Sequence, residues 1–324
     1  MQNKILRILF KSLKYLLLFT AIFLLASARL SYSSFVASDM STKLLFFKPV
    51  IQKLLSKKAD SAFIYHLLSD PRTKFEERYV RINVTGFLRK TDYSRAYDRA
   101  SVNKAARQMN ENYSIFDSAE KKFSVPKELI ATILWIETKF GSYTGNNQLA
   151  TVFLSTAMAD QPQFVKLNKE ELRKGFNGDT SELPALEKKL ETRSHKKAQW
   201  AINELLSLNK MYSKYSIPVT ELRGSWAGAF GYPQFLPSSY LKHAVDGNGD
   251  GTIDLFALDD AVYSIASYMK AYGWNNSDPE SQRKAIYSYN NSNDYVDAVI
   301  TLQHKIEQSN RNRNSYGPDT EESP

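Results

Sequence analysis

The chain has 324 residues, 43% of them hydrophobic and 24% charged, a balance typical of a globular protein that buries a substantial core. It contains no cysteine, which excludes disulfides and any lipid attached through a cysteine. The formal net charge is +9, and four of the positive charges fall in residues 1–28, which contain no acid, so the remainder carries +5. That excess suits an anionic polymer or surface outside the cytoplasm, and the lack of a basic motif argues against nucleic acid.

The N-terminus has the organisation of an export signal. A cationic segment (Lys4, Arg7, Lys11, Lys14) precedes the apolar run 15–25 and the small residues Ala26, Ser27 and Ala28. Because a transmembrane helix needs about 20 apolar residues, this run is short for a membrane span. We predict a signal peptide over residues 1–28, with a short uncleaved anchor as the alternative. The protein is therefore expected in the periplasm, associated with the inner membrane if the signal is retained.

Residues 29–115 predict an N-terminal helical region that packs on the main domain, which we place at 116–305. Residues 44–55 predict a helix interrupted by Pro49, and residues 96–123 have a helical pattern. Between them, Val80, Ile82 and Val84 alternate, which predicts a short strand or an extended crossing segment.

The segment 124–145 predicts a helix with one carboxylate on its inner face. Ser124 and Pro126 are helix-start signals. Glu137 lies four residues after Ile133 and three after Leu134, so it shares their apolar face. An inward Glu either is paired or keeps its proton to a higher pH, and a protonated acid near neutral pH is what glycoside cleavage requires. A structural hydrogen bond at a helix end is the alternative interpretation.

The composition of the chain changes at residue 160 and again near residue 197. Residues 160–192 are dominated by Lys, Glu and Asp, and they predict a solvated, partly helical insertion. Residues 197–215 then predict a long amphipathic helix. Strands are scarce and no repeat is evident, so the fold class is mainly α. From about residue 306 to 324 the composition predicts a disordered tail.

Residues 222–240, LRGSWAGAFGYPQFLPSSY, interleave small residues with aromatic ones and carry a single amide, Gln234. Small residues permit close backbone approach, so this segment predicts either a cleft wall or an unusual turn between helices.

Residues 246–260, DGNGDGTIDLFALDD, have the spacing of a calcium loop. Asp246, Asn248 and Asp250 offer oxygen ligands at positions one, three and five, with Gly251 at the sharp turn and the carbonyl of Thr252 next. Position twelve is Ala257 instead of an acid. A lengthened exit lets Asp260 supply the closing carboxylate, with Asp259 as the weaker choice, and an Asp/Gly turn without metal is the alternative.

Four segments in this order resemble the lytic murein transglycosylase B family (glycoside hydrolase family 103): WIETKFGSYTG, RGSWAGAFGYPQFLPSSY, DGNGDGTIDLFALDDAVYSIASYMKAYGW and YNNSNDYVDAVITL. The resemblance runs from about residue 50 to 302. It implies a lysozyme-like, mainly α catalytic core with an added helical region and a small EF-hand-like calcium loop. It also implies non-hydrolytic cleavage of the β-1,4 bond between N-acetylmuramic acid (MurNAc) and N-acetylglucosamine (GlcNAc), which leaves a 1,6-anhydroMurNAc end.

The resemblance also assigns residues. Glu137 matches the single catalytic Glu, and the matched groove residues are Ser225, Gln234, Phe235, Tyr268, Asn290 and Tyr295. The matched ligands of a structural Ca²⁺ are Asp246, Asn248, Asp250, Thr252 and Asp260. The chain departs from the family where an Arg pair normally precedes the long amphipathic helix, because Lys196 and Lys197 stand there. An upstream groove tyrosine is either Tyr93 or Tyr97.

The chemistry of the residues agrees with this assignment. Hydrolytic glycosidases use two carboxylates, whereas this sequence offers one inward Glu. We expect Glu137 to act first as acid and then as base, on peptidoglycan strands, in a monomer. Cell-wall synthases or hydrolases are the expected protein partners, and no nucleic acid is expected. The alternatives are a hydrolytic muramidase and a non-catalytic peptidoglycan-binding protein.

Overall fold

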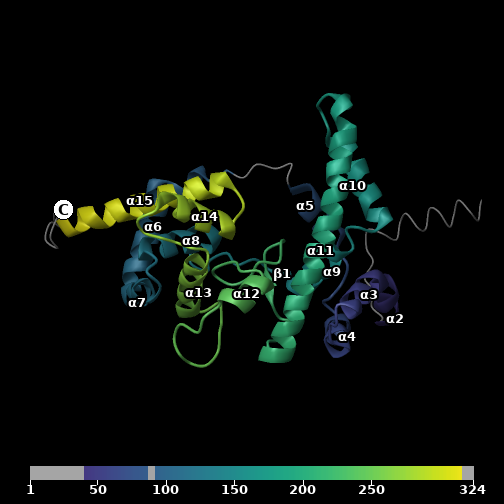
Figure 1. Cartoon of the computed structure of the whole chain (residues 1–324), viewed down its shortest axis with the longest axis horizontal. Coiled ribbons are helices and arrows are strands. Elements are labelled where there is room, and N and C mark those ends of the chain that lie inside the picture. Colours follow the sequence, from purple (N-terminus) through teal and green to yellow (C-terminus); the bar gives the residue numbers. More distant parts are fainter. Residues whose placement is uncertain (1–39, 87–91, 316–324) are drawn as a thin grey trace, which may run out of the picture.

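The computed structural model describes residues 40–86 and 92–315, and the fold in these ranges is mainly α (Figure 1). The first half contains α2 (Met40–Phe46), α3 (Lys48–Ser56), α4 (Ser61–Ser69), α5 (Glu77–Thr85), η2 (Ser94–Tyr97), α6 (Arg99–Glu111), α7 (Tyr113–Phe123), α8 (Lys127–Thr138) and α9 (Leu149–Ala157). The second half contains α10 (Pro162–Gly175), η3 (Thr180–Glu182), α11 (Leu183–Tyr215), α12 (Pro237–His243), α13 (Leu258–Ala271), α14 (Pro279–Tyr289) and α15 (Asn293–Ser315). Strands β1 (Asn147–Gln148) and β2 (Arg223–Gly224) form one antiparallel pair.

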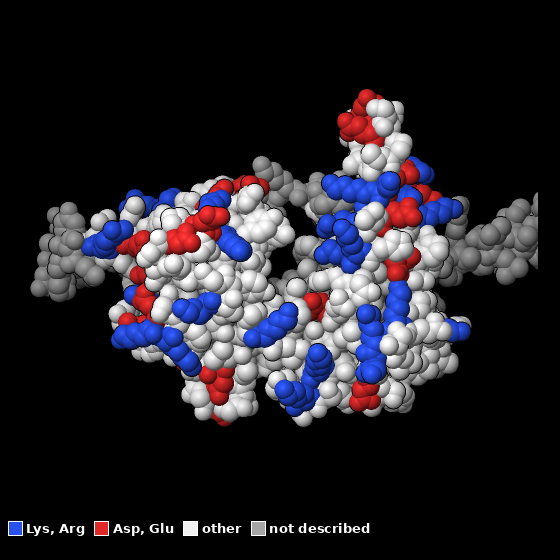
Figure 2. Space-filling model, viewed as in Figure 1, with Lys and Arg blue, Asp and Glu red and all other residues white. Residues whose placement is uncertain are grey.

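The helices form two groups that we call the α8 lobe and the α11 lobe. In the α8 lobe, α8 packs against α6, α7, α13 and α15. In the α11 lobe, α11 packs against α3, α4, α5, α9 and α10. The β1–β2 pair and α12 lie between the lobes (Figure 1). Figure 2 shows this face of the molecule hollowed between the two lobes.

The central helices of the two lobes are buried in different ways. In α8, every residue from Leu129 to Leu134 is fully buried, so the middle of this helix is enclosed on all sides. In α11 the buried stripe includes Leu190, Ala198, Leu205 and Leu208. Helix α9 is buried along its whole length, which fits its short apolar sequence LATVFLSTA between α5 and α11.

The predicted insertion at 160–192 is a helical hairpin made by α10 and the first part of α11, and it projects from the α11 lobe (Figure 1). Ion pairs from Lys169 to Glu191 and from Arg173 to Glu187 join its two helices. Because α11 begins at Leu183, Lys196 and Lys197 lie within this helix and not before it.

The structure differs from the sequence predictions at three further places. Residues 79–85 belong to helix α5, not to a strand, because Tyr79, Val80, Asn83 and Val84 are all buried, which is a helical pattern. Helix α15 continues past residue 306, the expected start of disorder, because Ile306 is fully buried. The expected boundary at 115 falls inside α7, and the preceding α6 packs on α8 and α15.

Within the described ranges, no helix is both long enough and apolar enough to span a bilayer. The predicted signal, residues 1–28, and the end of the predicted tail, 316–324, lie outside the described residues.

Candidate active site

Glu137 occupies the last turn of α8, at the end that meets the β1–β2 pair. Its residue surface is partly accessible, although residues 129–135, which precede it in α8, are buried. The phenolic OH of Tyr295, at the start of α15, donates a hydrogen bond of 2.7 Å to Oε1 of Glu137. Burial raises the pKa of Glu137 to about 7, and the Tyr295 hydrogen bond opposes this rise because it favours the charged form. Glu137 is therefore a carboxyl group that can hold a proton near neutral pH and release it.

Among the described residues, the side chain of Glu137 is hydrogen-bonded to Tyr295, and no hydrogen bond or ion pair joins it to a second acid. Hydrolytic glycosidases use a second carboxylate in addition to the acid.

The turn after Glu137 is held in an uncommon backbone conformation. Lys139 and Phe140 both have positive φ, and Gly141 follows with φ +85°. A Cβ on Gly141 would lie 2.2 Å from the ring of Tyr232, so only glycine fits. Thr138 Oγ1 donates to the Tyr232 carbonyl at 2.9 Å and accepts from the Gly141 N–H at 3.0 Å. The last turn of α8 is thereby fixed against residues 223–235.

Residues 223–235 form a tight backbone structure beside that turn. Strand β2 pairs with β1, and isolated bridges join Gly224 to Phe230 and Phe230 to Phe235. Gln234 has φ +51°, and its Nε2 donates to the carbonyls of Thr144 (3.1 Å) and Gly231 (2.9 Å). Gln234 is therefore a fixed amide that links this segment to the turn that follows Glu137.

Ser225 and Asn290 are partly exposed. Ser225 Oγ accepts the Ala229 N–H at 3.2 Å, and its hydrogen-bond partner is not Glu137. Asn290 lies in the extended link between α14 and α15, five residues before Tyr295, and its side chain makes no hydrogen bond to the described residues. The exposed Trp226, next to Ser225, offers an aromatic face with 48% of its surface accessible.

Phe235 and Tyr268 are placed beneath the surface. Both are buried, and their rings lie 5.6 Å apart. The OH of Tyr268 donates to the carbonyl of Ser288 at 2.6 Å, and burial raises the pKa of Tyr268. In this structure these two side chains support the site from below and offer little surface to a ligand.

The residues taken from the sequence do not include Tyr289, which belongs to the same cluster. Its ring lies 4.8 Å from that of Tyr268 and 5.9 Å from that of Phe235. The OH donates to the Pro233 carbonyl, and burial followed by the charge of Glu137 raises the pKa of Tyr289. The sequence feature that could have identified Tyr289 is its position directly before Asn290, at the end of a helix. Of the two upstream tyrosines, Tyr93 contacts Tyr295 edge to face at 5.8 Å.

Lys197 lies in α11 above the ring of Trp200, 4.3 Å from its centroid. Trp200 contacts Phe153, and Phe153 lies directly under Gly228 of the 223–235 segment. Burial lowers the pKa of Lys197 to about 8, and the structure gives it no carboxylate partner within the described ranges. Its ammonium group is a half-buried cation without a counter-ion.

The 246–260 loop is closed by Asp260, which is buried and accepts the N–H groups of Gly247 (2.7 Å) and Asp254 (2.6 Å). Asp246 accepts the N–H groups of Gly249 and Gly251 at 2.6 and 2.9 Å. Across the described ranges, no group of three His, Cys, Asp or Glu side chains is arranged to hold a metal ion.

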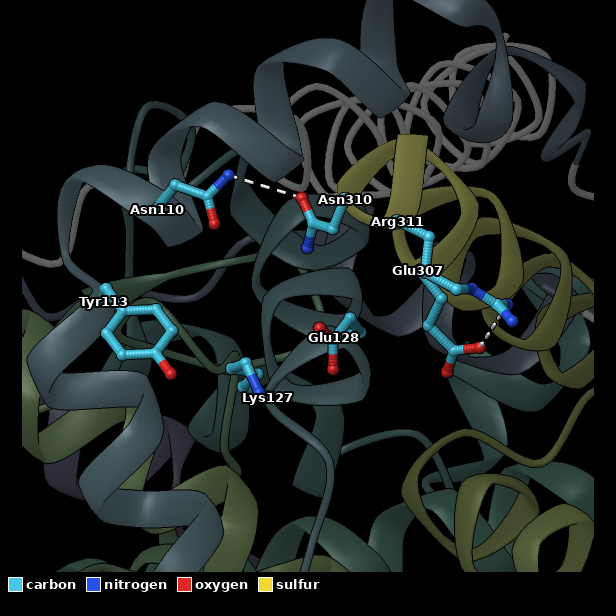
Figure 3. Close-up of a pocket in the computed structure, with 7 residues that line it drawn as sticks. All are labelled: Asn110, Tyr113, Lys127, Glu128, Glu307, Asn310 and Arg311. Atoms are coloured by element: carbon cyan, nitrogen blue, oxygen red, sulfur yellow. Dashed lines mark hydrogen bonds and ion pairs between the residues drawn. The ribbon is translucent and has the colours of Figure 1, made fainter. Parts of the chain in front are cut away.

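A separate pocket of about 730 Å³ opens at the other end of α8, around Glu128 in the first turn of the helix (Figure 3). Its lining comes from α6, α7, α8 and α15, and Asn110 and Asn310 are bonded across it at 3.3 Å. Since Glu137 is in the last turn of the same helix, this pocket is not part of the site.

Comparison with known proteins agrees with this geometry. The family model described as the transglycosylase SLT domain matches residues 88–283, which include α8, the 223–235 segment and the 246–260 loop. The chain belongs to this family. Over 165 residues it is also 30% identical to the membrane-bound lytic murein transglycosylase B of Escherichia coli (strain K12). That alignment covers 51% of the chain and 36% of the length of the relative.

Solved structures of lytic transglycosylases share the fold. The E. coli enzyme SLT35, solved in complex with calcium, has a TM-score of 0.61 at 22% identity, over 81% of this chain and 93% of its own. SltB3 from Pseudomonas aeruginosa, solved with NAG-anhNAM-pentapeptide, has a TM-score of 0.59 at 18% identity, over 81% of this chain and 79% of its own. The expected fold class, a mainly α core like that of the lysozyme-like lytic transglycosylases, is confirmed.

Proposed function

We propose that this protein is a lytic transglycosylase that cleaves the MurNAc–GlcNAc β-1,4 bond of peptidoglycan without water and leaves 1,6-anhydroMurNAc ends. The observation that carries the proposal is the position of Glu137, a partly accessible carboxyl at the end of α8 that accepts a hydrogen bond from Tyr295. Its pKa of about 7 suits both proton donation and proton acceptance. Membership of the transglycosylase SLT family and the names of its relatives support the same reaction.

In the proposed mechanism Glu137 first donates its proton to the glycosidic oxygen. The bond to C1 of MurNAc breaks, and the N-acetyl group of that sugar stabilises the positive charge that develops at C1. Glu137, now a carboxylate, takes the proton from the C6 hydroxyl of the same sugar as that oxygen attacks C1. Tyr295 donates its hydrogen bond to the carboxylate throughout, so it stabilises the charged form between the two proton transfers.

The hydrogen bonding of Glu137 supports this reaction over hydrolysis. A hydrolytic muramidase needs either a carboxylate nucleophile or a base that activates water. Within the described residues Glu137 is bonded to Tyr295 and to no second acid, so in the proposed mechanism the substrate's own N-acetyl and C6 hydroxyl groups supply those functions.

We infer that the hollow between the two lobes holds the glycan strand. Ser225, Gln234 and Asn290 provide polar contacts for hydroxyl and N-acetyl groups, and the exposed ring of Trp226 provides a stacking surface. Phe235 and Tyr268 act from beneath by fixing Tyr289. Lys197 supplies a cation for a lactyl or stem-peptide carboxylate of the substrate, although it is a point charge and cannot replace a bidentate Arg.

We also propose that the 246–260 loop binds a structural Ca²⁺. Asp246, Asn248, Asp250, the Thr252 carbonyl and Asp260 are hard oxygen donors, which fit Ca²⁺. Asp260 already accepts hydrogen bonds from Gly247, near the start of the loop, and from Asp254, in its second half, and Gly251 has the positive φ that a sharp turn requires. When bound, the ion would stabilise the loop that connects α12 to α13, and so the position of Tyr268 in α13. It would take no part in proton transfer.

Peptidoglycan lies outside the cytoplasm, so the proposed substrate and the predicted signal imply an exported, periplasmic protein. We propose that it acts as a monomer, and that any cell-wall synthases or hydrolases act with it as separate partners.

A matched pair of variants on one helix tests the proposed activity. Glu137→Gln should abolish clearing in a murein zymogram, because an amide cannot donate a proton to the leaving oxygen. Glu128→Gln changes another partly buried Glu of α8 and should retain activity. Full clearing by Glu137→Gln would exclude the mechanism, and it would leave a binding protein contaminated by another lytic enzyme as the remaining interpretation.

A further inference from the structure

Helices α2 and α3 form one nearly continuous helix at the start of the described chain. The link residue Phe47 has φ −86° and ψ 8°, which lies outside the α-helical region, so the helix is irregular at this one residue. The bonds from Phe47 N to Lys43 O and from Ile51 N to Phe47 O, both 2.9 Å, continue the helical pattern across the link. Residues on both sides of Phe47 therefore share one helical periodicity.

The inner side of this helix is conventional, since Phe47, Val50 and Leu54 are buried. The outer side is not, because three large apolar residues face solvent: Leu45 is 74% exposed, Leu55 47% and Leu44 43%. The residues Leu44, Leu45, Lys48, Gln52 and Leu55 recur at helical spacing and are all exposed, and we call them the α2–α3 outer face.

The helix that carries this face has charge of one sign, although two acids lie beside it: Asp160, which pairs with Lys53, and Asp60, which caps α4. Residues 40–59 contain five lysines and no acid. Lys48 lies within the outer face, and Lys57 and Lys58 follow its end; all three are exposed, and none has an ion-pair partner in the described structure. Apolar side chains flanked by lysines are the pattern of a helix that lies in the interface of an anionic bilayer.

The segment before Met40 is short enough to hold the α2–α3 outer face near a membrane. The apolar run 15–25 ends 14 residues before Met40. A linker of that length spans at most about 50 Å even when fully extended. A molecule that retains this run in a membrane therefore holds the α2–α3 outer face close to the lipid. Since no described helix can span a bilayer, the contact would be peripheral.

We propose that the α2–α3 outer face docks on an anionic phospholipid bilayer. The leucines enter the headgroup region, and Lys48, Lys57 and Lys58 contact lipid phosphates. Helices α2 to α4 lie at one end of the long axis and the end of α15 lies at the other, so docking leaves the hollow between the lobes open (Figure 1). This surface is separate from Glu137 and does not depend on the proposed activity.

The lack of cysteine permits a direct test on the full chain. A single cysteine at Leu45→Cys carries an environment-sensitive fluorophore. Tyr287→Cys, on α14, which packs against α13 and α15 of the α8 lobe, serves as the matched control, since both positions are exposed. Vesicles of phosphatidylglycerol and phosphatidylcholine should shift the emission at position 45 to the blue and leave position 287 unchanged. Gln52→Cys provides a second probe on the same face.

Two double variants of lysines then test whether vesicle binding depends on this face or on the overall positive charge of the protein. Lys48→Gln with Lys57→Gln should weaken vesicle binding by about fivefold for each lysine removed. Lys270→Gln with Lys284→Gln, on the α8 lobe, should leave it unchanged. No shift at positions 45 and 52, or equal shifts at 45 and 287, would overturn the proposal. A shift at 45 that depends on protein concentration without vesicles would instead assign the face to a second copy of the chain.

Discussion

Tyr295 and Glu137 are joined by a 2.7 Å hydrogen bond although they lie in α15 and α8, 158 residues apart in the chain. Tyr295 is 1% exposed, so its position is fixed by the core and not by the ligand. Burial raises the pKa of Glu137 and Tyr295 lowers it, and the balance gives a value of about 7. The two residues together determine the pH at which the proposed acid is available.

Replacing Tyr295 with Phe should raise the pKa of Glu137, because the lost hydrogen bond favours the charged carboxylate. The alkaline limb of the pH profile of kcat/KM should move up by as much as about one unit, and the rate should fall by about tenfold. Tyr240→Phe is the matched control, since its OH donates to the Ile253 carbonyl. An unchanged alkaline limb in Tyr295→Phe would show that this hydrogen bond does not set the pKa of the catalytic acid.

Glu137→Gln should stabilise the protein at pH 8 and have little effect at pH 4. The pKa of Glu137 is about 7 when folded against 4.5 when unfolded, so the folded state binds more protons between these values. The free energy of unfolding therefore falls as pH rises from 4.5 to 7, by up to about 3 kcal/mol. Thermal unfolding of both proteins at the two pH values measures this difference, and an equal change at pH 4 and pH 8 would refute the titration as its cause.

Gly141→Ala should lower both stability and activity. The substitution puts a Cβ at φ +85° and 2.2 Å from the Tyr232 ring, which displaces the turn that follows Glu137. The expected loss is about 1–3 kcal/mol in the free energy of unfolding, with reduced kcat. Gly175→Ala is the control, because nothing lies within 4 Å of its added Cβ. Equal effects in the two variants would mean that the turn does not position Glu137.

Calcium should raise the melting temperature without moving the pH profile. At 100 times its Kd, a ligand specific for the folded state adds about 2.7 kcal/mol, which corresponds to a rise of roughly 4 °C for a chain of this size. Asp250→Asn should reduce the rise, whereas Asp297→Asn, on the surface of α15, should not. Mg²⁺ should produce a smaller rise because it requires a tighter octahedral shell. An unchanged melting temperature in Ca²⁺ would show that the loop does not bind calcium.

Lys197→Met should weaken the binding of peptide-bearing murein and leave peptide-free glycan unaffected. The loss of a charge-assisted contact should raise KM by about tenfold or more. In the unmodified protein this preference should disappear as pH rises through about 8, the pKa of Lys197. Lys188→Met, on the exposed side of α11, serves as the control. Equal KM changes on both substrates would show that Lys197 has a structural role, packing on Trp200, and does not bind the peptide.

The sequence predicted those parts of the site that depend on local spacing. The helix that carries Glu137 and the close backbone approach in the 223–235 segment are patterns within one stretch of chain. The oxygen ligands of the 246–260 loop are also a local pattern, and their binding of calcium stays a prediction. The position of Tyr295 and its five-residue separation from Asn290 came from the family resemblance. Their contact with Glu137 depends on the packing of α15 on α8, which no local pattern encodes.

The predictions that the structure contradicts also depend on packing between distant parts of the chain. Residues 80–84 alternate like a strand, but α5 packs on α9 and α11 through the one helical face that Tyr79, Val80, Asn83 and Val84 share. The polar residues after 306 predicted disorder, whereas buried Ile306 and the Asn110–Asn310 bond attach the end of α15 to the core. Tyr289 was not assigned to the site because tyrosines at helix ends are common, and only the packed cluster gives it a role.

The most direct test of the central claim is the chemistry of the products formed from purified murein sacculi in heavy-oxygen water. If Glu137 acts alone as acid and then base, mass spectrometry should find 1,6-anhydroMurNAc ends that are lighter than reducing ends by one water and carry no heavy oxygen. Reducing MurNAc ends that have incorporated heavy oxygen would show that water is the nucleophile and would contradict this account.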